Sequence, residues 1–314
     1  MMSRSARRIA LCGALKEKEP PAMTDPDSAT QTFVEHRELL FSIVYNILGS
    51  VADTEDALQE TWLAWASANR DQVESPRAYL VRIAVNQALA RRAVLARRRE
   101  TYIGQWLPEP LVTDDPDPVV GSETSSMALL VVLETLSPAE RAVFVLHEAF
   151  GYPHTDIADM LGRSPEAVRQ LAHRARRHVR ARRPRYRVDA QVQQRATERF
   201  VAATLGGDLE TLLDVLAPDV TLWTDGGGKG PATSLQPVHG RDAVAKLLAI
   251  VGTNVPDDFE VRYRHVNGDP SAVLFSGESP FAVLVLDLAP DSDHVRGVYS
   301  VTNPDKLTRI PSHG

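Results

Sequence analysis

The residues best placed to do chemistry in this chain are arginines, and their chemistry is recognition. From His154 to Arg180 the sequence reads HTDIADMLGRSPEAVRQLAHRARRHVR, in which five arginines follow a glycine and a serine-proline pair. Guanidinium groups donate paired hydrogen bonds to guanine edges and also hold phosphates. We therefore expect this stretch to be a helix-turn-helix that reads DNA.

Small and capping residues predict where the motif turns. Gly162 lies past the end of a first helix, where positive φ is needed, and Ser164 and Pro165 suit the cap and first position of a second. Ala158 and Val168 are expected to pack where the helices cross. The alternative is a solvated basic helix on an ordinary α-hairpin. The expected DNA-reading face consists of Arg163, Ser164, Glu166, Arg169, Gln170, His173, Arg174 and Arg177.

Charge is divided unequally along the 314 residues, which carry a formal net charge of −6. Residues 77–105 hold seven arginines against one acidic residue, and residues 164–183 hold the same ratio. From residue 188 onward there are ten basic and seventeen acidic residues. This asymmetry predicts DNA contact by the first part and a different role for the last third. At 43% hydrophobic residues, the chain is long enough for two or three globular domains.

Several classes of protein are disfavoured by composition. Cys12 is the only cysteine, so neither a disulfide framework nor a thiolate zinc site is available within one chain, and a reducing cytoplasm is expected. The histidines are scattered, with only His173 and His178 close in sequence, so we expect no metal and no cofactor. No apolar run is long enough for a membrane span. Residues 1–28 are expected to form a disordered leader, and Met23 is an alternative start.

Apolar spacing predicts three helices before a linker. The first spans Gln31 to Leu48, the second begins at Asp53, which we expect to cap it, and the third runs from Ser75 to about Arg99. The outer face of the second is acidic, with Asp53, Glu55, Asp56, Gln59 and Glu60. The outer face of the third is basic, with Arg77, Arg82, Arg91, Arg92, Arg97, Arg98 and Arg99.

The rest of the chain divides into a linker, a helical segment and a mixed domain. Residues 106–126 hold four prolines, five acidic residues and no basic one, which predicts an extended linker. Ser137, Pro138 and Glu140 form a capping box for a helix that ends at Gly151. Helices near 190–205, 208–216 and 240–251 then precede antiparallel strands near 219–224, 259–267, 271–276, 281–288 and 294–302, which describes an α+β domain.

Together these segments resemble an extracytoplasmic-function sigma factor of bacterial RNA polymerase. DTEDALQETWLAW at 53–65 looks like the region 2 helix that docks on the core enzyme, and PRAYLVRIAVNQALARR at 76–92 looks like the segment that melts and reads the minus-10 element. LSPAERAVFVLHEAFGYPHTDIADMLGRSPEAVRQLAHRAR at 136–176 looks like region 4, which reads the minus-35 element. The resemblance implies core RNA polymerase and promoter DNA as partners. It also implies region 2 over residues 29–103, a linker over 104–126 and region 4 over 127–184.

The resemblance assigns roles to individual residues. Core docking is expected of Asp53, Glu55, Asp56, Gln59, Glu60 and Trp62. Minus-10 contact is expected of Arg77, Tyr79, Arg82, Asn86, Arg91, Arg92, Arg97 and Arg98, and minus-35 contact of the DNA-reading face defined above. Tyr79 could stack on a melted base, or pack in the core beside Leu80. Ala90 stands where relatives usually carry aspartate, so an orienting contact is expected to be missing there.

Three further motifs resemble the signatures of the sigma subfamily with a fused SnoaL-like domain, a cone of helices wrapped by a curved sheet: WLPEP, DGGGK and NPDKL. The resemblance implies an all-α region 2, an all-α helix-turn-helix region 4 and an α+β SnoaL-like domain over 188–314 that regulates them in cis, without a separate anti-sigma factor. DGGGK could instead be only a tight turn. The residues expected between domains are Trp106, Leu107, Pro108, Glu109, Pro110, Asp225, Gly226, Gly227, Gly228, Lys229, Asn303, Pro304, Asp305, Lys306 and Leu307.

Other functions stay open from the sequence. An enzyme of the cyclase or isomerase kind would need an acid or base inside the cone, for which Asp225, His265 and Tyr299 are candidates. A concave, apolar cone could instead sense a small molecule without turnover. A one-component repressor would join the helix-turn-helix to such a sensor, but it would have no use for residues 33–100.

Overall fold

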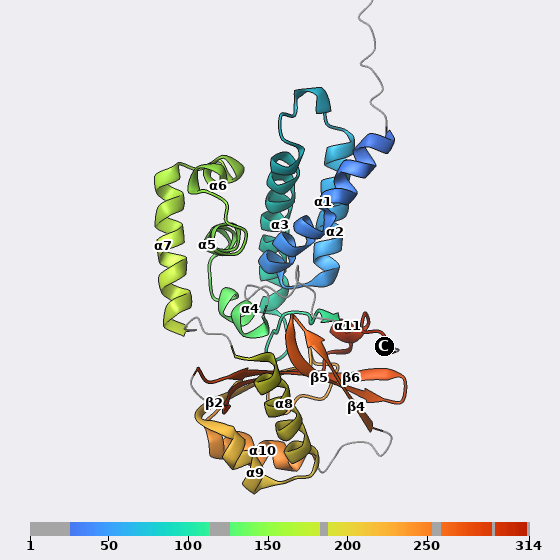
Figure 1. Ribbon diagram of the computed structural model, residues 1–314, viewed down its shortest axis with the longest axis vertical. Coiled ribbons are helices and arrows are strands. Elements are labelled where there is room, and N and C mark those ends of the chain that lie inside the picture. The colour runs from blue at the N-terminus through green and yellow to red at the C-terminus, as the bar shows by residue number, and fades with distance from the viewer. Residues whose placement is uncertain (1–25, 114–125, 183–187, 253–258, 291–292, 313–314) are drawn as a thin grey trace, which may run out of the picture.

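The computed structural model describes residues 26–113, 126–182, 188–252, 259–290 and 293–312. Two helical halves stand above a domain built on a curved sheet (Figure 1). The expected leader at 1–28 lies outside the described residues except for its last three. Those three already belong to the first helix, which starts at a proline, a residue well suited to a helical N-terminus.

The first helical half consists of α1 (Pro26–Leu48), α2 (Val51–Ala66) and α3 (Pro76–Glu100), with a short 3-10 turn (Arg70–Gln72) before α3. Gly49 ends α1 at φ +72°, and the chain then re-enters a helix at once. The expected cap of α2 is wrong. Ser50 is extended and its hydroxyl accepts from the Asp53 amide, so Asp53 lies in the first turn of α2.

The second helical half contains the expected helix-turn-helix. It comprises α4 (Met127–Leu133), α5 (Pro138–Phe144), a π-helical turn (Val145–Ala149), α6 (His154–Leu161) and α7 (Pro165–Arg182). The capping box of Ser137 and Glu140 is confirmed, as is the left-handed Gly162 at φ +60°. Ala158 and Val168 are buried where α6 and α7 cross, so the apolar plug predicted from the sequence is also confirmed.

The two helical halves share one apolar core. Buried side chains of α1, α2 and α3 form a single cluster with those of α4 to α7. Contact between them runs mainly from α3 to α5 and α6. The halves are therefore packed against each other.

The last domain places three helices on one mixed sheet. The helices are α8 (Ala190–Leu205), α9 (Leu209–Val215) and α10 (Arg241–Gly252), and a short α11 (Pro304–Leu307) follows the last strand. The strands are β1 (Val112–Thr113), β2 (Leu216–Asp225), β3 (Val238–His239), β4 (Phe259–Val266), β5 (Asp269–Ser276), β6 (Ser279–Leu288) and β7 (Val295–Val301), in the order β1-β4-β5-β6-β7-β2-β3. The α+β class is confirmed.

Two details of the sheet differ from the sequence prediction. All strands were expected to be antiparallel, but β2 and β7 run parallel. The reason is that β2, the first long strand of the domain, lies beside β7, the last strand of the antiparallel series β4 to β7. The linker also contributes a strand. Val112 and Thr113 pair with His265 and Val266 of β4, so this part of the linker is fixed to the sheet edge.

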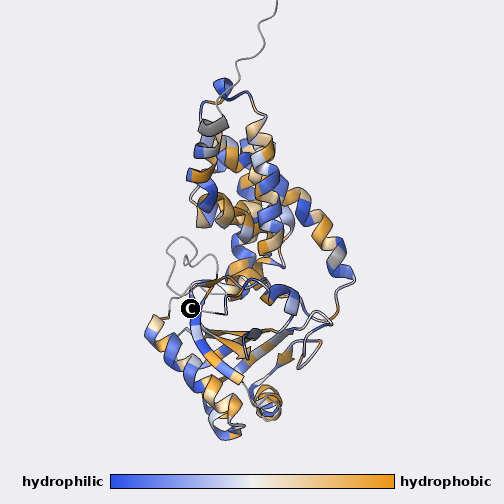
Figure 2. Cartoon of the chain, turned by 90° about the vertical axis from the view of Figure 1, so that its right-hand side faces the viewer, coloured by the Kyte–Doolittle hydropathy of each residue, from blue (hydrophilic) through white to orange (hydrophobic). Residues whose placement is uncertain are grey.

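The sheet has two buried faces, because neighbouring residues of a strand point to opposite sides. Leu274, Leu284 and Val298 face α8 and α10 in one cluster. Val273, Val285 and Tyr299 face the opposite side, where they pack with Leu107, Met127 and Ala128. In Figure 2 these strands are rich in hydrophobic residues and curve beneath the helical halves. One sheet thus separates the interior of its own domain from the contact with the rest of the chain.

Among the described residues, no helix is both long and apolar enough to cross a membrane.

Candidate nucleic-acid interface

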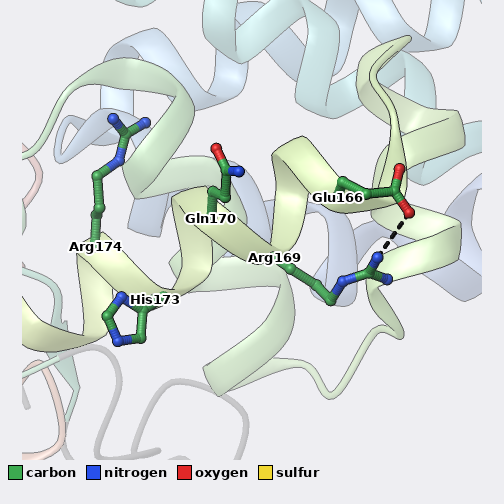
Figure 3. Close-up of a pocket in the computed structure, with 5 residues that line it drawn as sticks. All are labelled: Glu166, Arg169, Gln170, His173 and Arg174. Carbon is green, nitrogen blue, oxygen red and sulfur yellow. Dashed lines mark hydrogen bonds and ion pairs between the residues drawn. The ribbon is translucent and has the colours of Figure 1, made fainter.

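The outward face of α7 carries the predicted DNA-reading residues. All eight of them, from Arg163 in the turn to Arg177, are exposed. Five line a shallow hollow along the helix (Figure 3), namely Glu166, Arg169, Gln170, His173 and Arg174. Ser164 caps the helix by accepting from the Ala167 amide at 3.2 Å. Because the turn, the cap and the buried plug orient α7, its donors project together into solvent.

Two of these arginines are held by carboxylates. Arg169 donates to Glu166 at 2.7 Å, and the Arg174 Nε lies 3.3 Å from Glu140. Hydrogen bonds from its own backbone amide and from Arg169 lower the pKa of Glu166, so its carboxylate is ionised at neutral pH. Such a surface can offer guanidinium forks to guanine and a carboxylate to the cytosine amino group.

Two histidines contact each other where the π-helical turn leads into α6. The rings of His147 and His154 stack with centroids 4.1 Å apart, and His147 Nδ1 lies 3.0 Å from the Tyr152 carbonyl oxygen. Burial, and then the nearby His147, lower the pKa of His154. This pair could not be predicted from the sequence, because the two residues are seven positions apart and lie on either side of Gly151, with His147 inside a π-helical turn that has no sequence signal here. The described residues contain no group of three side chains suited to a metal.

Helix α3 presents only part of its predicted minus-10 surface. Arg77, Arg82 and Arg97 are exposed, and the Arg98 side chain lies outside the described residues. Tyr79 is half-buried, with its ring 5.8 Å from that of Trp65 and with the Arg82 guanidinium carbon 5.2 Å above it. Tyr79 therefore packs on the core and keeps one side near solvent.

Arg91 and Arg92 do not lie on an open basic face as predicted. Arg91 turns onto α2, where it pairs with Asp53 at 3.1 Å and Glu60 at 3.2 Å and also with Asp56. Arg92 is buried, and its guanidinium donates to the Ile47 carbonyl at 2.9 Å. The reason is packing, because α3 lies against both α1 and α2 at this level and the helical period directs the two arginines inward.

Asn86 links the two helical halves. Its side-chain amide donates to the Met160 carbonyl of α6 at 3.3 Å. A residue predicted to contact the minus-10 element is thus engaged by the helix-turn-helix.

The acidic face of α2 is also only partly free. Asp56, Gln59 and Glu60 are exposed, but Asp56 and Glu60 pair with Arg91 of α3. Glu55 pairs with Arg37 of α1 at 2.7 Å. Trp62 packs edge-on against Phe33 at 5.5 Å. Next to it, Leu63 is 61% and Val34 56% exposed, so acidic and aliphatic side chains share this surface. That mixture suits a protein partner rather than DNA.

A buried charge cluster joins α3 to the second helical half. Glu134, which follows α4, pairs with Arg92 at 3.3 Å and also with Arg99 and Arg141. Arg141 is fully buried and donates to the Asn46 carbonyl at 2.7 Å. Burial would raise the pKa of Glu134, but the three guanidinium groups outweigh it and lower the pKa to about 2.

The three tail motifs meet at one buried ion pair, which we call the seam. Asp225 accepts from the Lys306 ammonium at 2.6 Å, the Leu107 amide at 2.8 Å and the Tyr102 hydroxyl at 2.5 Å. The ammonium lies 3.4 Å above the ring of Trp106. Burial lowers the pKa of Lys306 to about 8. WLPEP, DGGGK and NPDKL therefore each supply atoms to this seam.

The glycines of DGGGK serve both as a turn and as a contact surface. Gly227 has φ +60°, and a Cβ atom on it would lie 2.3 Å from the Asn303 side-chain nitrogen. Asn303 in turn donates to the Tyr102 hydroxyl at 2.7 Å. Lys229 makes no such contact. It pairs with Asp305 at 2.6 Å in an exposed bridge within its own domain, so Lys229 does not take the predicted interdomain contact in this structure. The Asp305 carboxylate, in contrast, lies close enough to Tyr102 to act on its hydroxyl electrostatically.

Glu109 anchors the linker to the start of α2. Its carboxylate accepts from the Val51 amide at 2.7 Å, which suits a negative charge at a helix N-terminus. Its carbonyl accepts from the Tyr45 hydroxyl at 2.7 Å, which itself accepts from the Asn267 side chain at 2.7 Å. Asn267, at φ +55°, reaches region 2 from the β4–β5 turn. Leu107 to Pro110 are all buried, so WLPEP is a fixed contact.

Five residues of these contacts were missed in the sequence: Tyr45, Tyr102, Glu134, Arg141 and Asn267. The Asn267-Gly268 pair indicates a hairpin turn, but nothing in the sequence says what the turn touches. The other four belong to helical or loop segments in which no motif marks them.

The candidate catalytic groups are not assembled. Asp225 lies at the seam, His265 lies opposite Thr113 in β4, and Tyr299 stacks on Trp223 at 4.8 Å on the side of the sheet away from α8 and α10. None of the three lines the cavity inside the domain.

Comparison with known proteins agrees with this division of the chain. Residues 32–99 match the family model of Sigma-70 region 2, residues 126–179 that of Sigma-70 region 4, and residues 197–298 that of the SnoaL-like domain. The ECF RNA polymerase sigma factor SigJ of Mycobacterium tuberculosis is 38% identical over 288 residues, which cover 88% of this chain and 92% of that protein. Sigma factor SigG of the same organism is 31% identical, over 92% of this chain and 86% of its own.

The fold is similar as well. The crystal structure of M. tuberculosis SigJ matches with a TM-score of 0.70 and 34% identity, covering 89% of this chain and 98% of the other. The chain thus has two sigma regions in the expected order, followed by a SnoaL-like domain, and it matches SigJ over most of its length. These findings agree on one family. The chain belongs to the family of ECF RNA polymerase sigma factors that carry a C-terminal SnoaL-like domain.

Proposed function

We propose that this sigma factor is restrained in cis by its SnoaL-like domain, which holds the two DNA-reading regions in a closed arrangement. The observation that carries the proposal is the buried Asp225–Lys306 pair, because it closes on Trp106 and Leu107 of the linker between those regions. Burial of Leu107 adds about 2 kcal/mol to the same contact.

In this proposal each region has one partner. The acidic and aliphatic face of α2 docks on core RNA polymerase, the exposed arginines of α3 meet the minus-10 element, and α7 reads the minus-35 element. Asn86 and Arg91 are engaged by other helices in the closed arrangement. Contact of Asn86 with the promoter would require its release from the Met160 carbonyl, so the active form has α3 separated from α6. Arg91 would separately have to leave the carboxylates of α2.

The fused domain takes the place of a separate anti-sigma factor in this scheme, and the protein works in the cytoplasm with the polymerase. We assign no reaction to the SnoaL-like domain. The residues proposed for catalysis lie on different faces of its sheet, which supports a regulatory role.

Transcription with core RNA polymerase in vitro tests the proposal. The full chain is compared with versions ending after residue 187 and after residue 302. The second truncation keeps the sheet but removes Lys306, so the seam opens and initiation is expected to rise. Equal initiation by all three versions would exclude regulation in cis. If none of them bound core enzyme, the one-component repressor would be the better assignment.

A further inference from the structure

The SnoaL-like domain encloses a cavity of about 300 Å³ between α8, α10 and the inner face of the sheet. This volume equals roughly ten water molecules at their liquid volume. Aliphatic and aromatic side chains form most of its wall, including Phe200, Leu248, Phe281 and Leu284. No titratable side chain lines it among the residues that the structure describes. A charged molecule would have no oppositely charged side chain to pair with in this lining, and the lining offers no acid or base for proton transfer.

Hydroxyl groups gather at one end of this cavity. Thr224 and Ser300 are neighbours across β2 and β7, and the Thr224 hydroxyl lies 2.6 Å from that of Thr233. Thr302 also lines the wall, and its hydroxyl bonds the Pro231 carbonyl. Ser300 makes no side-chain hydrogen bond within the described parts of the chain. One end of an occupant can therefore be hydrogen-bonded while the rest is surrounded by apolar groups.

The hydroxyl end is also the back of the seam. Thr224 precedes Asp225 at the end of β2, and Thr302 precedes Asn303 just after β7. Thr224 and Thr302 line the cavity, whereas the residues that follow them bond Leu107 and Tyr102 at the seam. The Thr302 amide donates to the Asp225 carbonyl at 2.8 Å. A Cβ atom on Gly230, the residue after DGGGK, would lie 2.0 Å from the Thr302 carbonyl oxygen, so the chain leaving this turn is packed tightly on the wall. The wall cannot shift without moving seam residues.

We infer that the cavity binds an uncharged, largely apolar molecule with one hydrogen-bonding end, and that this molecule stabilises the closed seam. The inference rests on the proposed function, since it names the kind of molecule whose binding would shift the balance between the closed and the open seam. An occupant needs Thr224, Ser300 and Thr302 in place, and the closed seam holds them there. By linkage, the closed seam strengthens binding by the same factor by which the occupant strengthens the seam.

The test uses 1-decanol and decanoate as probes of equal chain length on the full chain. Calorimetry is expected to show one site for decanol and at least about tenfold weaker binding of decanoate, because the carboxylate would be buried without a cation. Ala282→Phe, which fills the cavity, is expected to abolish decanol binding. Ser300→Ala removes only the hydroxyl at its end, so it is expected to weaken binding even if Ala282→Phe does not fold.

Coupling is measured separately, without polymerase. Decanol is expected to slow hydrogen exchange at the Leu107 amide, which bonds Asp225, and Lys306→Met, which opens the seam, is expected to weaken decanol binding. Equal binding of decanol and decanoate, or full binding by both cavity variants, would overturn the assigned site. Binding in the cavity with no effect at Leu107 would overturn the coupling. Neither result depends on the truncation experiment, whose failure would instead remove regulation in cis.

Discussion

Replacing Lys306 by methionine is the sharpest perturbation of the seam. Methionine keeps most of the aliphatic side chain over Trp106 but removes the ammonium, so closing the seam would bury the Asp225 carboxylate without its cation. Asp225 is fully buried and the Lys306 side chain only 7% exposed in the closed arrangement. Breaking such a pair by removing one partner costs about 3 to 5 kcal/mol.

The expected effect lies at the lower end of that range. The carboxylate keeps two donors, the Tyr102 hydroxyl and the Leu107 amide, so we expect about 3 kcal/mol. At 1.4 kcal/mol per decade this shifts the ratio of closed to open molecules roughly a hundredfold. In the open form both side chains are hydrated, so the loss falls on closure and not on the folding of either domain.

Hydrogen exchange of the Leu107 amide measures this shift directly, because that amide is protected only while it bonds Asp225. Lys306→Met should lower its protection about a hundredfold. Lys229→Met is the matched control, since Lys229 belongs to an exposed pair with Asp305 and should leave protection unchanged. Unchanged protection in Lys306→Met, or an equal loss in both variants, would refute the electrostatic account of the seam.

Three further predictions follow from other contacts. The low pKa of Glu134 means that its ion pairs stabilise the folded helical halves above pH 4.5, the ordinary pKa, and that this stability is lost as the pH falls toward about 2. Glu134→Gln should therefore be several kcal/mol less stable than the wild type near pH 7, roughly 3 kcal/mol, with the gap in urea midpoints closing in acid; a constant gap would contradict this. Tyr45→Phe and Asn267→Gly each remove one side of a buried hydrogen bond, and glycine keeps the positive φ of Asn267. In a double-mutant cycle of unfolding free energies they should couple by about 1 kcal/mol, whereas strict additivity would show that the bond contributes nothing. Arg169→Ala should weaken promoter binding by about 1 to 3 kcal/mol at its preferred minus-35 sequence and relax selection at one base pair, as measured by competition binding over a set of single-base variants. If binding weakened equally for all of these DNA variants, Arg169 would contact a phosphate and not a base.

Local patterns were enough to predict the elements and the DNA-reading face. Gly162, Ser164 and Pro165 act within one turn of the backbone, and Val168 follows the helical period, so each could be placed without knowledge of distant residues. The five longer strands of the last domain, β2 and β4 to β7, were found in the same way, from alternation and turn residues, whereas the two-residue β3 was missed.

The sequence-based predictions were wrong where a residue could lie either in solvent or against another helix. Arg91, Arg92 and Arg97 are the same type of residue on one helix, but the packing of α3 decides that two of them meet acids or carbonyls and one meets solvent. Local sequence cannot make that distinction, because it depends on which helix lies on each side. The same holds for the parallel contact of β2 and β7, which are separated by most of the domain.

An arginine-rich helix-turn-helix, a second basic helix and an acidic α+β domain could all be predicted from the amino-acid sequence, since capping, periodicity and charge are local properties. Which of these parts contact one another depends on the tertiary structure. Asp225 and Lys306 form an ion pair because the contact of β2 with β7 and the position of α11 bring them together. Tyr102, Trp106 and Leu107 cover this pair and exclude water from it. The strength of that pair depends on desolvation, which is a property of the packed molecule.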